Sequence, residues 1–232
     1  AKAKKAVESI YPIIEKWGNG YINRCFYSGS IAKGTAVSIS TDADVFISLR
    51  SSITDTLKKV YTSLYNAFNQ NGYQPRKQNV SIGIVVNGVK IDLVPGVRQG
   101  QYGNDHSLYK SKADTWTKTN VDTHISTVSK SNRLNEIKLI KIWRQLNKLD
   151  FPSLFVELLV IEALKNAQYD DLKPNLMKVF RYISDNIKTV RFIDPSNTNN
   201  IISDDITITE KTNLKKAADI AINAQLWSQV VY

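Results

Sequence analysis

The residues around Asn87-Gly88 constrain the fold of this chain more than any other segment. Residues 80–86 carry apolar side chains at every second position, and residues 89–94 continue the same alternation. Asn-Gly is the favoured pair for the two-residue type I′ turn, which joins antiparallel strands. The pattern therefore predicts a hairpin whose return strand has apolar residues on one face and Lys90 and Asp92 on the other.

Helical and extended periodicities follow one another along the rest of the chain. Strands are expected at residues 25–27 and 43–49. Helices are expected at residues 4–17, 54–70, 132–148, 153–166, 174–188 and 210–228. Two stretches rich in polar and turn-forming residues, 95–112 and 194–200, are expected to be loops, and the chain is expected to be helical from about residue 116 onward.

This order of elements predicts an α+β protein with a mixed α/β lobe over residues 1–115 and a helical lobe over residues 116–232. The helix at residues 4–17 has two possible places, within the first lobe or packed on the second.

Composition limits the chemistry that is open to the chain. With Cys25 as the single cysteine and two histidines, an intrachain disulfide and a zinc site built on Cys or several His are excluded. A metal would need carboxylate ligands, which favours Mg²⁺ or Mn²⁺. The net charge of +10 favours an anionic partner such as a nucleotide or nucleic acid. No apolar run reaches the roughly 18 residues of a membrane span, and the N-terminus does not resemble a signal peptide. A cytoplasmic protein is expected, and no feature indicates an oligomer interface.

Three features of the first lobe point to phosphoryl transfer when they are taken together. Gly29-Ser30 follows a predicted strand, and Gly29 would let the backbone approach a phosphate while Ser30 donates its hydroxyl and N–H. Asp42 and Asp44 stand two residues apart, which places both carboxylates on one face of a strand. Asp92 can add a third if the hairpin joins the same sheet. Such carboxylates repel one another unless divalent cations neutralise them, and two cations can activate a hydroxyl against a triphosphate.

Residues 28–49, SGSIAKGTAVSISTDADVFISL, resemble the signature of the polymerase-β-like nucleotidyltransferase superfamily, in which Gly-Ser precedes Asp-x-Asp by about ten residues. Residues 115–125 and 134–164 resemble the helical-lobe segments of the bacterial cGAS/DncV-like (SMODS) enzymes, which are related to oligoadenylate synthases. DPSNTNN at 194–200 resembles the Asp-Pro-x-Asn motif of the same group and of archaeal CCA-adding enzymes. The fold implied is a mixed-sheet nucleotidyltransferase N-lobe with a helical C-lobe.

The resemblance implies roles for individual residues. Asp42 and Asp44 would bind two Mg²⁺ or Mn²⁺ ions, and Asp92 would bind the ion that activates the acceptor hydroxyl. The phosphates of the donor nucleotide would be held by Gly29, Ser30, Lys33, Lys141 and Ser153.

Structural roles stay open for part of this set. Lys141 could be a helix-surface lysine, and Ser153 could cap the helix that follows it. Glu157 lies in an apolar helix and needs a partner, which Lys141 or Arg144 could provide.

The resemblance also implies a substrate class and a reaction. NTPs, ATP first among them, would transfer a nucleotidyl group to a hydroxyl and release pyrophosphate. With another nucleotide as acceptor, the product would be a cyclic or linear oligonucleotide that signals in antiphage defence. Three alternatives stay open: transfer to the 3′ end of a tRNA or another RNA, transfer to a protein or small molecule, and an RNA-binding module without catalysis.

Overall fold

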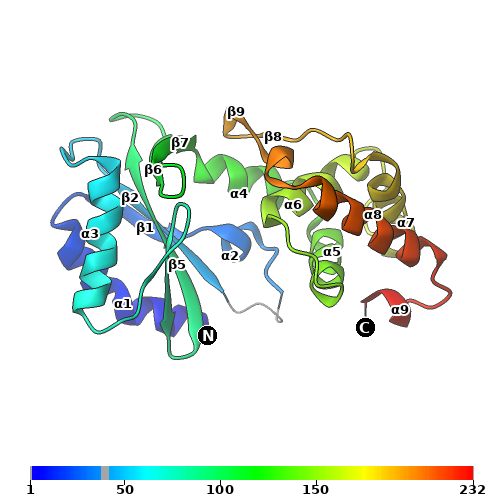
Figure 1. Ribbon diagram of the computed structural model, residues 1–232, viewed down its shortest axis with the longest axis horizontal. Helices are drawn as coiled ribbons and strands as arrows, with labels where there is room; N and C mark the ends of the chain where they lie inside the picture. Colours follow the sequence, from blue (N-terminus) through cyan, green and yellow to red (C-terminus); the bar gives the residue numbers. More distant parts are fainter. Residues whose placement is uncertain (1, 38–41, 232) are drawn as a thin grey trace. The chain divides into compact units, whose positions relative to one another are not determined.

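The computed structural model describes residues 2–37 and 42–231 (Figure 1). The chain forms two compact units. Unit 1 contains Ala1–Lys33 and Ser40–Ile125, and unit 2 contains Gly34–Ile39 and Ser126–Tyr232. The division into lobes at residue 115 stays a prediction. Residues 38–41, which belong to the spacer between Gly-Ser and Asp-x-Asp, lie outside the described residues.

A mixed sheet forms the centre of unit 1 (Figure 1). Its strands are β1 (Ile22–Tyr27), β2 (Ala43–Leu49), β3 (Arg76–Lys77), β4 (Ile82–Val86), β5 (Val89–Arg98), β6 (His106–Lys110) and β7 (Thr115–Thr119). The order is β1-β2-β5-β4-β3, and β6 pairs with both β5 and β7. Strands β2 and β5 are parallel and the other pairs are antiparallel, so the predicted mixed sheet is confirmed.

The predicted hairpin is formed by β4 and β5. Asn87 and Gly88 have φ angles of 50° and 74°, as a type I′ turn requires at both central positions. Val86 pairs with Val89 across the turn, and Gly83 pairs with Asp92 further along the hairpin. This register places the polar residues of the return strand on the predicted face.

Two amphipathic helices, α1 (Lys2–Gly18) and α3 (Leu57–Gln70), cover one face of the sheet. Ile10 and Leu64 are fully buried there against the apolar face of β2 and β5. The first turn of α3 is capped by the Thr56 hydroxyl, which accepts from the Lys59 N–H. The helix α1 therefore belongs to the core of unit 1, the first of its two expected places.

Two expectations about the secondary structure of unit 1 are wrong. The stretch 95–112 is not all loop, since β5 continues to Arg98 and β6 follows at His106–Lys110. Residues 115–119 are the strand β7 rather than the start of a helix. The missing N–H of Pro95 is tolerated because β4 pairs with β5 only up to Leu93, while β6 begins to pair at Val97.

Unit 2 is built mainly from helices around an apolar core. They are α5 (Leu134–Leu146), α6 (Ser153–Ala163), α7 (Leu172–Asn186), α8 (Ile208–Asn223) and α9 (Ser228–Val231); α4 (Val121–Ser129) contains the boundary between the units. The 194–200 stretch is not a simple loop, because β8 (Ile193–Asp194) and β9 (Asn197–Ile201) form a small hairpin before the 3₁₀ turn η1 (Ile202–Asp205). None of the helices in the described ranges has both the length and the apolar character needed to cross a membrane.

Candidate active site

The turn after β1 brings the Gly-Ser motif against the strand that carries Asp44. Tyr27 pairs with Val45, so the chain leaving β1 arrives beside Asp44. The Ser28 N–H donates to the Asp44 carbonyl oxygen at 2.8 Å. Gly29 then begins the short helix α2 (Gly29–Lys33) with a φ of +57°, and a Cβ on Gly29 would overlap the Asp44 carboxylate. Gly29 therefore permits a close approach between the backbone and the Asp44 carboxylate, while its approach to a phosphate stays a prediction.

Asp44 and Asp92 are register partners on the parallel strands β2 and β5. Partners in neighbouring strands point to the same face of a sheet, and here that face is opposite to the one covered by α1 and α3. Both side chains are half-buried. The condition on which the sequence made the contribution of Asp92 depend, that the hairpin joins the sheet of Asp44, is met.

Asp42 differs from its expected position. The strand β2 begins at Ala43, so Asp42 precedes the strand instead of lying within it beside Asp44, and its side chain is exposed. Asp42 is nevertheless close enough for its negative charge to raise the pKa of Asp92. The structure thus brings together Gly29, Asp44 and Asp92, with Asp42 at the margin of this group.

The environment of Asp92 disfavours its charged form. Burial is the main cause that raises the pKa of Asp92 above its ordinary value, and the Asp42 charge acts in the same direction. A hydrogen bond from Gln78 and the positive charges of Arg76 and Lys90 oppose this rise. A cation bound at this carboxylate would relieve the same penalty.

The sequence analysis did not identify Gln78 as part of this site. Its Nε2 donates to Asp92 Oδ1 at 2.7 Å. The available signal was Gly83, an isolated glycine within a predicted strand, since such a glycine often marks a close approach by another group.

The remaining phosphate-binding candidates lie in different parts of the structure. Ser30 and Lys33 belong to α2 in unit 1, where Ser30 is half-buried and Lys33 is buried. Lys141 and Ser153 belong to α5 and α6 of unit 2. Ser153 is the first residue of α6 and Pro152 occupies the cap position, so the alternative of a Ser153 cap is wrong. The phosphate-binding role of all four residues stays a prediction.

Lys141 is part of a buried polar group in unit 2. Its Nζ lies 2.6 Å from Glu157 Oε1 and donates to Thr35 Oγ1 at 2.8 Å, while the Thr35 hydroxyl donates to Glu157 Oε1 at 3.0 Å. The predicted need of Glu157 for a partner is confirmed, and the partner is Lys141. Lys141 is only 4% exposed, so it is not the surface lysine of the structural alternative.

Another polar pair lies on the same face of β2 as Asp44. The imidazole Nδ1 of His106 lies 2.8 Å from the Asn104 carbonyl, which can only accept, so Nδ1 carries the proton. The Nε2 atom then accepts from the Ser48 hydroxyl at 2.8 Å. Burial lowers the pKa of His106, which favours the neutral imidazole in this pair.

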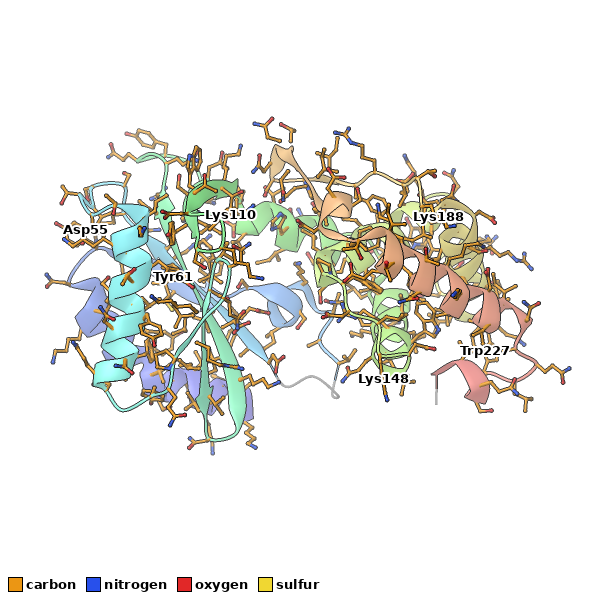
Figure 2. The ribbon with its side chains drawn as sticks, in the orientation of Figure 1. Asp55, Tyr61, Lys110, Lys148, Lys188 and Trp227 are labelled. Atoms are coloured by element: carbon orange, nitrogen blue, oxygen red, sulfur yellow. The ribbon has the colours of Figure 1, made fainter. Side chains whose placement is uncertain are left out.

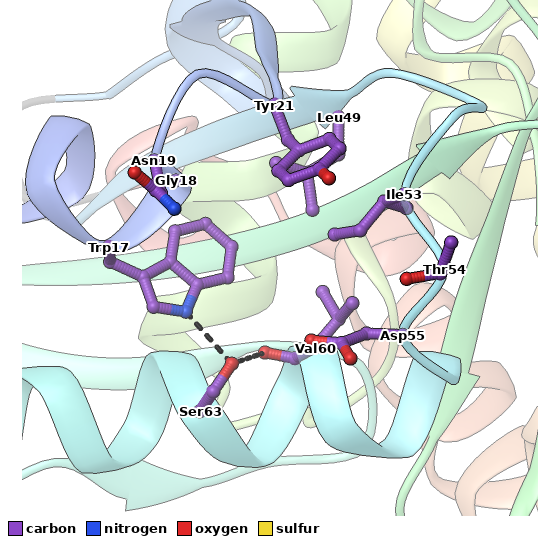
Figure 3. A pocket seen from close by; sticks show the side chains of 10 residues that line it. All are labelled: Trp17, Gly18, Asn19, Tyr21, Leu49, Ile53, Thr54, Asp55, Val60 and Ser63. Carbon is purple, nitrogen blue, oxygen red and sulfur yellow. Dashed lines mark hydrogen bonds between the residues drawn. The ribbon is translucent and has the colours of Figure 1, made fainter.

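A cavity in unit 1 lies away from these carboxylates (Figure 3). Trp17, Tyr21 and Ile53 line it, and the Trp17 indole N–H donates to the Ser63 hydroxyl at 2.9 Å. Leu49, which also lines the cavity, is five residues from Asp44 along β2 and therefore faces the opposite side of the sheet. The cavity is consequently separate from the candidate active site.

Comparison with known proteins identifies the family. The sequence profile of the Second Messenger Oligonucleotide or Dinucleotide Synthetase (SMODS) domain matches residues 4–132, more than half of the chain. The chain belongs to the SMODS family. This membership confirms the predicted resemblance to the cGAS/DncV-like group of the nucleotidyltransferase superfamily.

Individual relatives of this SMODS protein are distant in sequence. The cyclic AMP-AMP-AMP synthase of Escherichia coli strain MS 115-1 is 23% identical over 186 residues, which cover 70% of this chain and 57% of the synthase. The chain thus spans a little more than half the length of that relative.

Solved structures share the fold of this SMODS protein. E. coli MS115-1 CdnC with ATP has a TM-score of 0.75 at 21% identity, covering 99% of this chain and 92% of that one. Bradyrhizobium diazoefficiens CdnG with GTP has a TM-score of 0.78 at 14% identity, covering 100% and 89%. Vibrio cholerae DncV, a cyclic AMP-GMP synthase, has a TM-score of 0.68 at 12% identity, covering 89% and 66%. These likenesses confirm the predicted α+β nucleotidyltransferase fold.

Proposed function

We propose that this SMODS protein joins the α-phosphate of one NTP to a hydroxyl of another nucleotide and releases pyrophosphate. The observation that carries this proposal is the juxtaposition of Gly29, Asp44 and Asp92 on one face of the sheet. A glycine turn and two neighbouring carboxylates supply a place for phosphates and oxygen ligands for the cations that accompany them.

The carboxylate pair fits a divalent cation of the magnesium type. Within residues 2–37 and 42–231, no three Asp, Glu, His or Cys side chains form a group that could hold a metal ion. Mg²⁺, however, is commonly held by one or two carboxylates together with substrate phosphates, and it keeps several waters. Asp44 and Asp92 provide two such ligands, and their hard oxygen atoms favour Mg²⁺ or Mn²⁺ over Zn²⁺.

Each residue of the site has a task in this proposal. Asp42 and Asp44 would hold both Mg²⁺ or Mn²⁺ ions, and Asp92 would hold the ion that activates the acceptor hydroxyl. Bound ions of this kind would supply Lewis acidity, which lowers the pKa of an attacking hydroxyl and offsets the charge of a triphosphate. Gly29 keeps the backbone close to the carboxylates, and Ser30 donates its hydroxyl and N–H to the β- and γ-phosphates.

Further groups act on the donor nucleotide. Lys33, Lys141 and Ser153 contribute contacts to the triphosphate, and we propose these roles from the resemblance of the motifs. ATP is the first donor to test, because the E. coli relative is named a cyclic AMP-AMP-AMP synthase and CdnC was solved with ATP. The proposed product is a cyclic or linear oligonucleotide.

The test is incubation of the purified chain with each α-³²P-labelled NTP and Mg²⁺ or Mn²⁺, with and without tRNA. Products are separated by chromatography and their masses are measured, while released pyrophosphate is assayed in parallel. A low-molecular-weight oligonucleotide together with pyrophosphate is the expected result. Label on tRNA would instead identify an RNA 3′-end nucleotidyltransferase. Binding of RNA without turnover under any condition would indicate a non-catalytic module.

We also propose that the oligonucleotide is a signal in antiphage defence, made in the cytoplasm where NTPs are available. Cells that express the wild-type chain should survive phage challenge better than cells that express Asp44→Asn. Equal survival of the two strains would contradict this role and leave the reaction itself unaffected.

A further inference from the structure

Gln78 reaches the Asp92 carboxylate from two strands away. It directly follows β3, which pairs with β4, and β4 in turn pairs with β5, the strand of Asp92. The Gln78 side chain nevertheless donates from Nε2 to Asp92 Oδ1 at 2.7 Å. The amide therefore extends across β4 to reach the carboxylate.

Hydrogen bonds to the backbone of Gln78 hold the residue in place, and a hydrogen bond to its side-chain oxygen fixes the direction of its amide. Its side-chain Oε1 accepts from the Ser81 hydroxyl at 3.1 Å, and its backbone N–H donates to the Ser81 carbonyl at 3.0 Å. The backbone carbonyl of Gln78 accepts from the Ser111 hydroxyl at 2.5 Å. It also accepts at 2.6 Å from the hydroxyl of Tyr61 on α3, which is labelled in Figure 2. Because a donor occupies Oε1, the amide presents its NH₂ group to Asp92.

Gly83 provides the space for this contact. It is the register partner of Asp92 in the hairpin, so it lies directly beneath the path of the amide. A Cβ on Gly83 would lie 2.6 Å from Gln78 Nε2 and 3.1 Å from Asp92 Oδ1. Any larger residue at position 83 would thus push the amide away from the carboxylate.

The chemistry of the donor is suited to a carboxylate that binds a cation. An amide is neutral, so it can fix the orientation of a carboxylate while the carboxylate keeps its full negative charge. A lysine or arginine in the same place would neutralise that charge and compete with a metal ion. Metal-binding carboxylates are commonly oriented by hydrogen bonds of this kind.

We propose that Gln78 is a positioning residue that holds Asp92 Oδ1 and thereby leaves Oδ2 to bind a divalent cation. This inference rests on the proposed function, in which Asp92 is a metal ligand. Gln78 itself touches neither substrate nor metal.

The test measures metal binding directly as well as turnover. Mn²⁺ affinity of Gln78→Leu is determined from the electron paramagnetic resonance signal of free Mn²⁺, in the presence of a non-hydrolysable ATP analogue. We expect a loss of about 10- to 100-fold in metal affinity, with a matching rise in the Mn²⁺ concentration that gives half-maximal turnover. The melting temperature without metal should stay close to that of the wild type. Gln70→Leu, a change at the exposed end of α3, is the matched control and should behave as wild type.

A second variant tests position separately from chemistry. Gly83→Ala keeps the Gln78 amide but displaces it, so it should weaken Mn²⁺ binding as Gln78→Leu does. If Gln78→Leu does not fold, Gly83→Ala alone tests the role of the Gln78 amide. If Gly83→Ala and Gln78→Leu keep the Mn²⁺ affinity of the wild type while Asp92→Asn loses affinity, the positioning role of Gln78 is overturned but the metal role of Asp92 is not. Wild-type Mn²⁺ affinity in Asp92→Asn would instead overturn the metal role of Asp92 and this inference with it.

Discussion

The Asp44 carboxylate occupies the space in which a side chain on Gly29 would have to begin. This relationship follows from the pairing of β1 with β2 and from the hydrogen bond between the Ser28 N–H and the Asp44 carbonyl. The position of the Gly-Ser turn and the direction of the Asp44 carboxylate are therefore coupled, and a change in one must disturb the other.

Gly29→Ala should impair both stability and catalysis. The positive φ of +57° alone should cost about 1–2 kcal/mol of unfolding free energy. The added methyl group also displaces Asp44, and a misplacement of about 1 Å can lower a rate about 10²-fold. Gly20→Ala is the matched control, because Gly20 has a φ of +80° but no atom within 4 Å of its Cβ position. Chemical denaturation and single-turnover rates of both variants separate backbone strain from displacement, and equal activity of the two would contradict the coupling.

Asp42→Asn and Asp44→Asn should each abolish nucleotidyl transfer while the fold stays intact. In the proposed mechanism each change removes a charged metal ligand, and each relieves repulsion among the carboxylates when no metal is bound. Thermal stability without Mg²⁺ should therefore hold or rise. Turnover assays and melting curves on the same preparations test this, and more than a few per cent of wild-type activity in both variants would disprove the assignment.

Asp92→Ala should separate catalysis from nucleotide binding. In the proposed mechanism Asp92 serves the acceptor hydroxyl, so affinity for NTP with Mg²⁺ should stay within a few-fold of wild type. The rate should fall by at least about 10²-fold, the usual order for loss of a catalytic group. Nucleotide titration and single-turnover kinetics measure the two effects. A loss of activity that only follows the folded fraction would show that Asp92 is structural.

The buried pair of Lys141 and Glu157 should be sensitive to loss of one partner. Lys141→Met should lower the unfolding free energy by about 3–5 kcal/mol, because it leaves the Glu157 carboxylate buried without a counter-charge. Glu157→Leu added to Lys141→Met should recover most of that loss, as a double-mutant cycle in denaturant would measure. If Lys141 also contacts the triphosphate, Lys141→Ala should weaken NTP binding more than NDP binding, whereas equal losses would point to packing alone.

His106 should make stability depend on pH below about 6.5, the ordinary histidine value. Burial is the main cause that lowers its pKa in the folded protein, so the unfolded chain binds the proton first as pH falls. The unfolding free energy should therefore decrease with falling pH, with a contribution from this residue of at most about 1.4 kcal/mol per pH unit. Unfolding of wild type and His106→Gln between pH 5 and 7.5 tests this, and the variant should show the shallower slope. Parallel slopes would contradict it.

Much of the fold could be predicted because periodicity reports burial. Alternation around Asn87-Gly88 gave the hairpin, and helical spacing gave α3 and the main helices of unit 2. Periodicity does not report pairing with distant strands, so β7 was taken for the start of a helical region although Thr115–Thr119 is rich in strand-forming threonine. Likewise, the polar and turn-forming composition of residues 95–112 predicted a loop, although β5 continues to Arg98 and β6 follows at His106–Lys110.

The part of the candidate site that depends on the pairing of neighbouring strands could be predicted from the sequence. The part that depends on contacts between side chains from distant segments could not. Strand parity and the hairpin placed Asp92 beside Asp44. The contact of Gln78 with Asp92 instead requires a side chain to cross an intervening strand, and the only local signal, Gly83, does not say which residue makes the contact. The strand β2 starts at Ala43 as predicted, so Asp42 lies just outside it and the two-residue spacing from Asp44 does not fix the face on which Asp42 lies.

Thr35 has a consequence for how this chain can be divided. It follows α2 of unit 1 in the sequence but belongs to unit 2. Its hydroxyl is hydrogen-bonded to Lys141 and Glu157 within the core of that unit. A fragment that starts at Ser126 would lack this hydroxyl and would leave the buried ion pair with one partner fewer. Unit 2 is thus not formed by one continuous segment of the chain. A chimera that exchanges the helices of unit 2 between relatives would also need to exchange the residues around position 35.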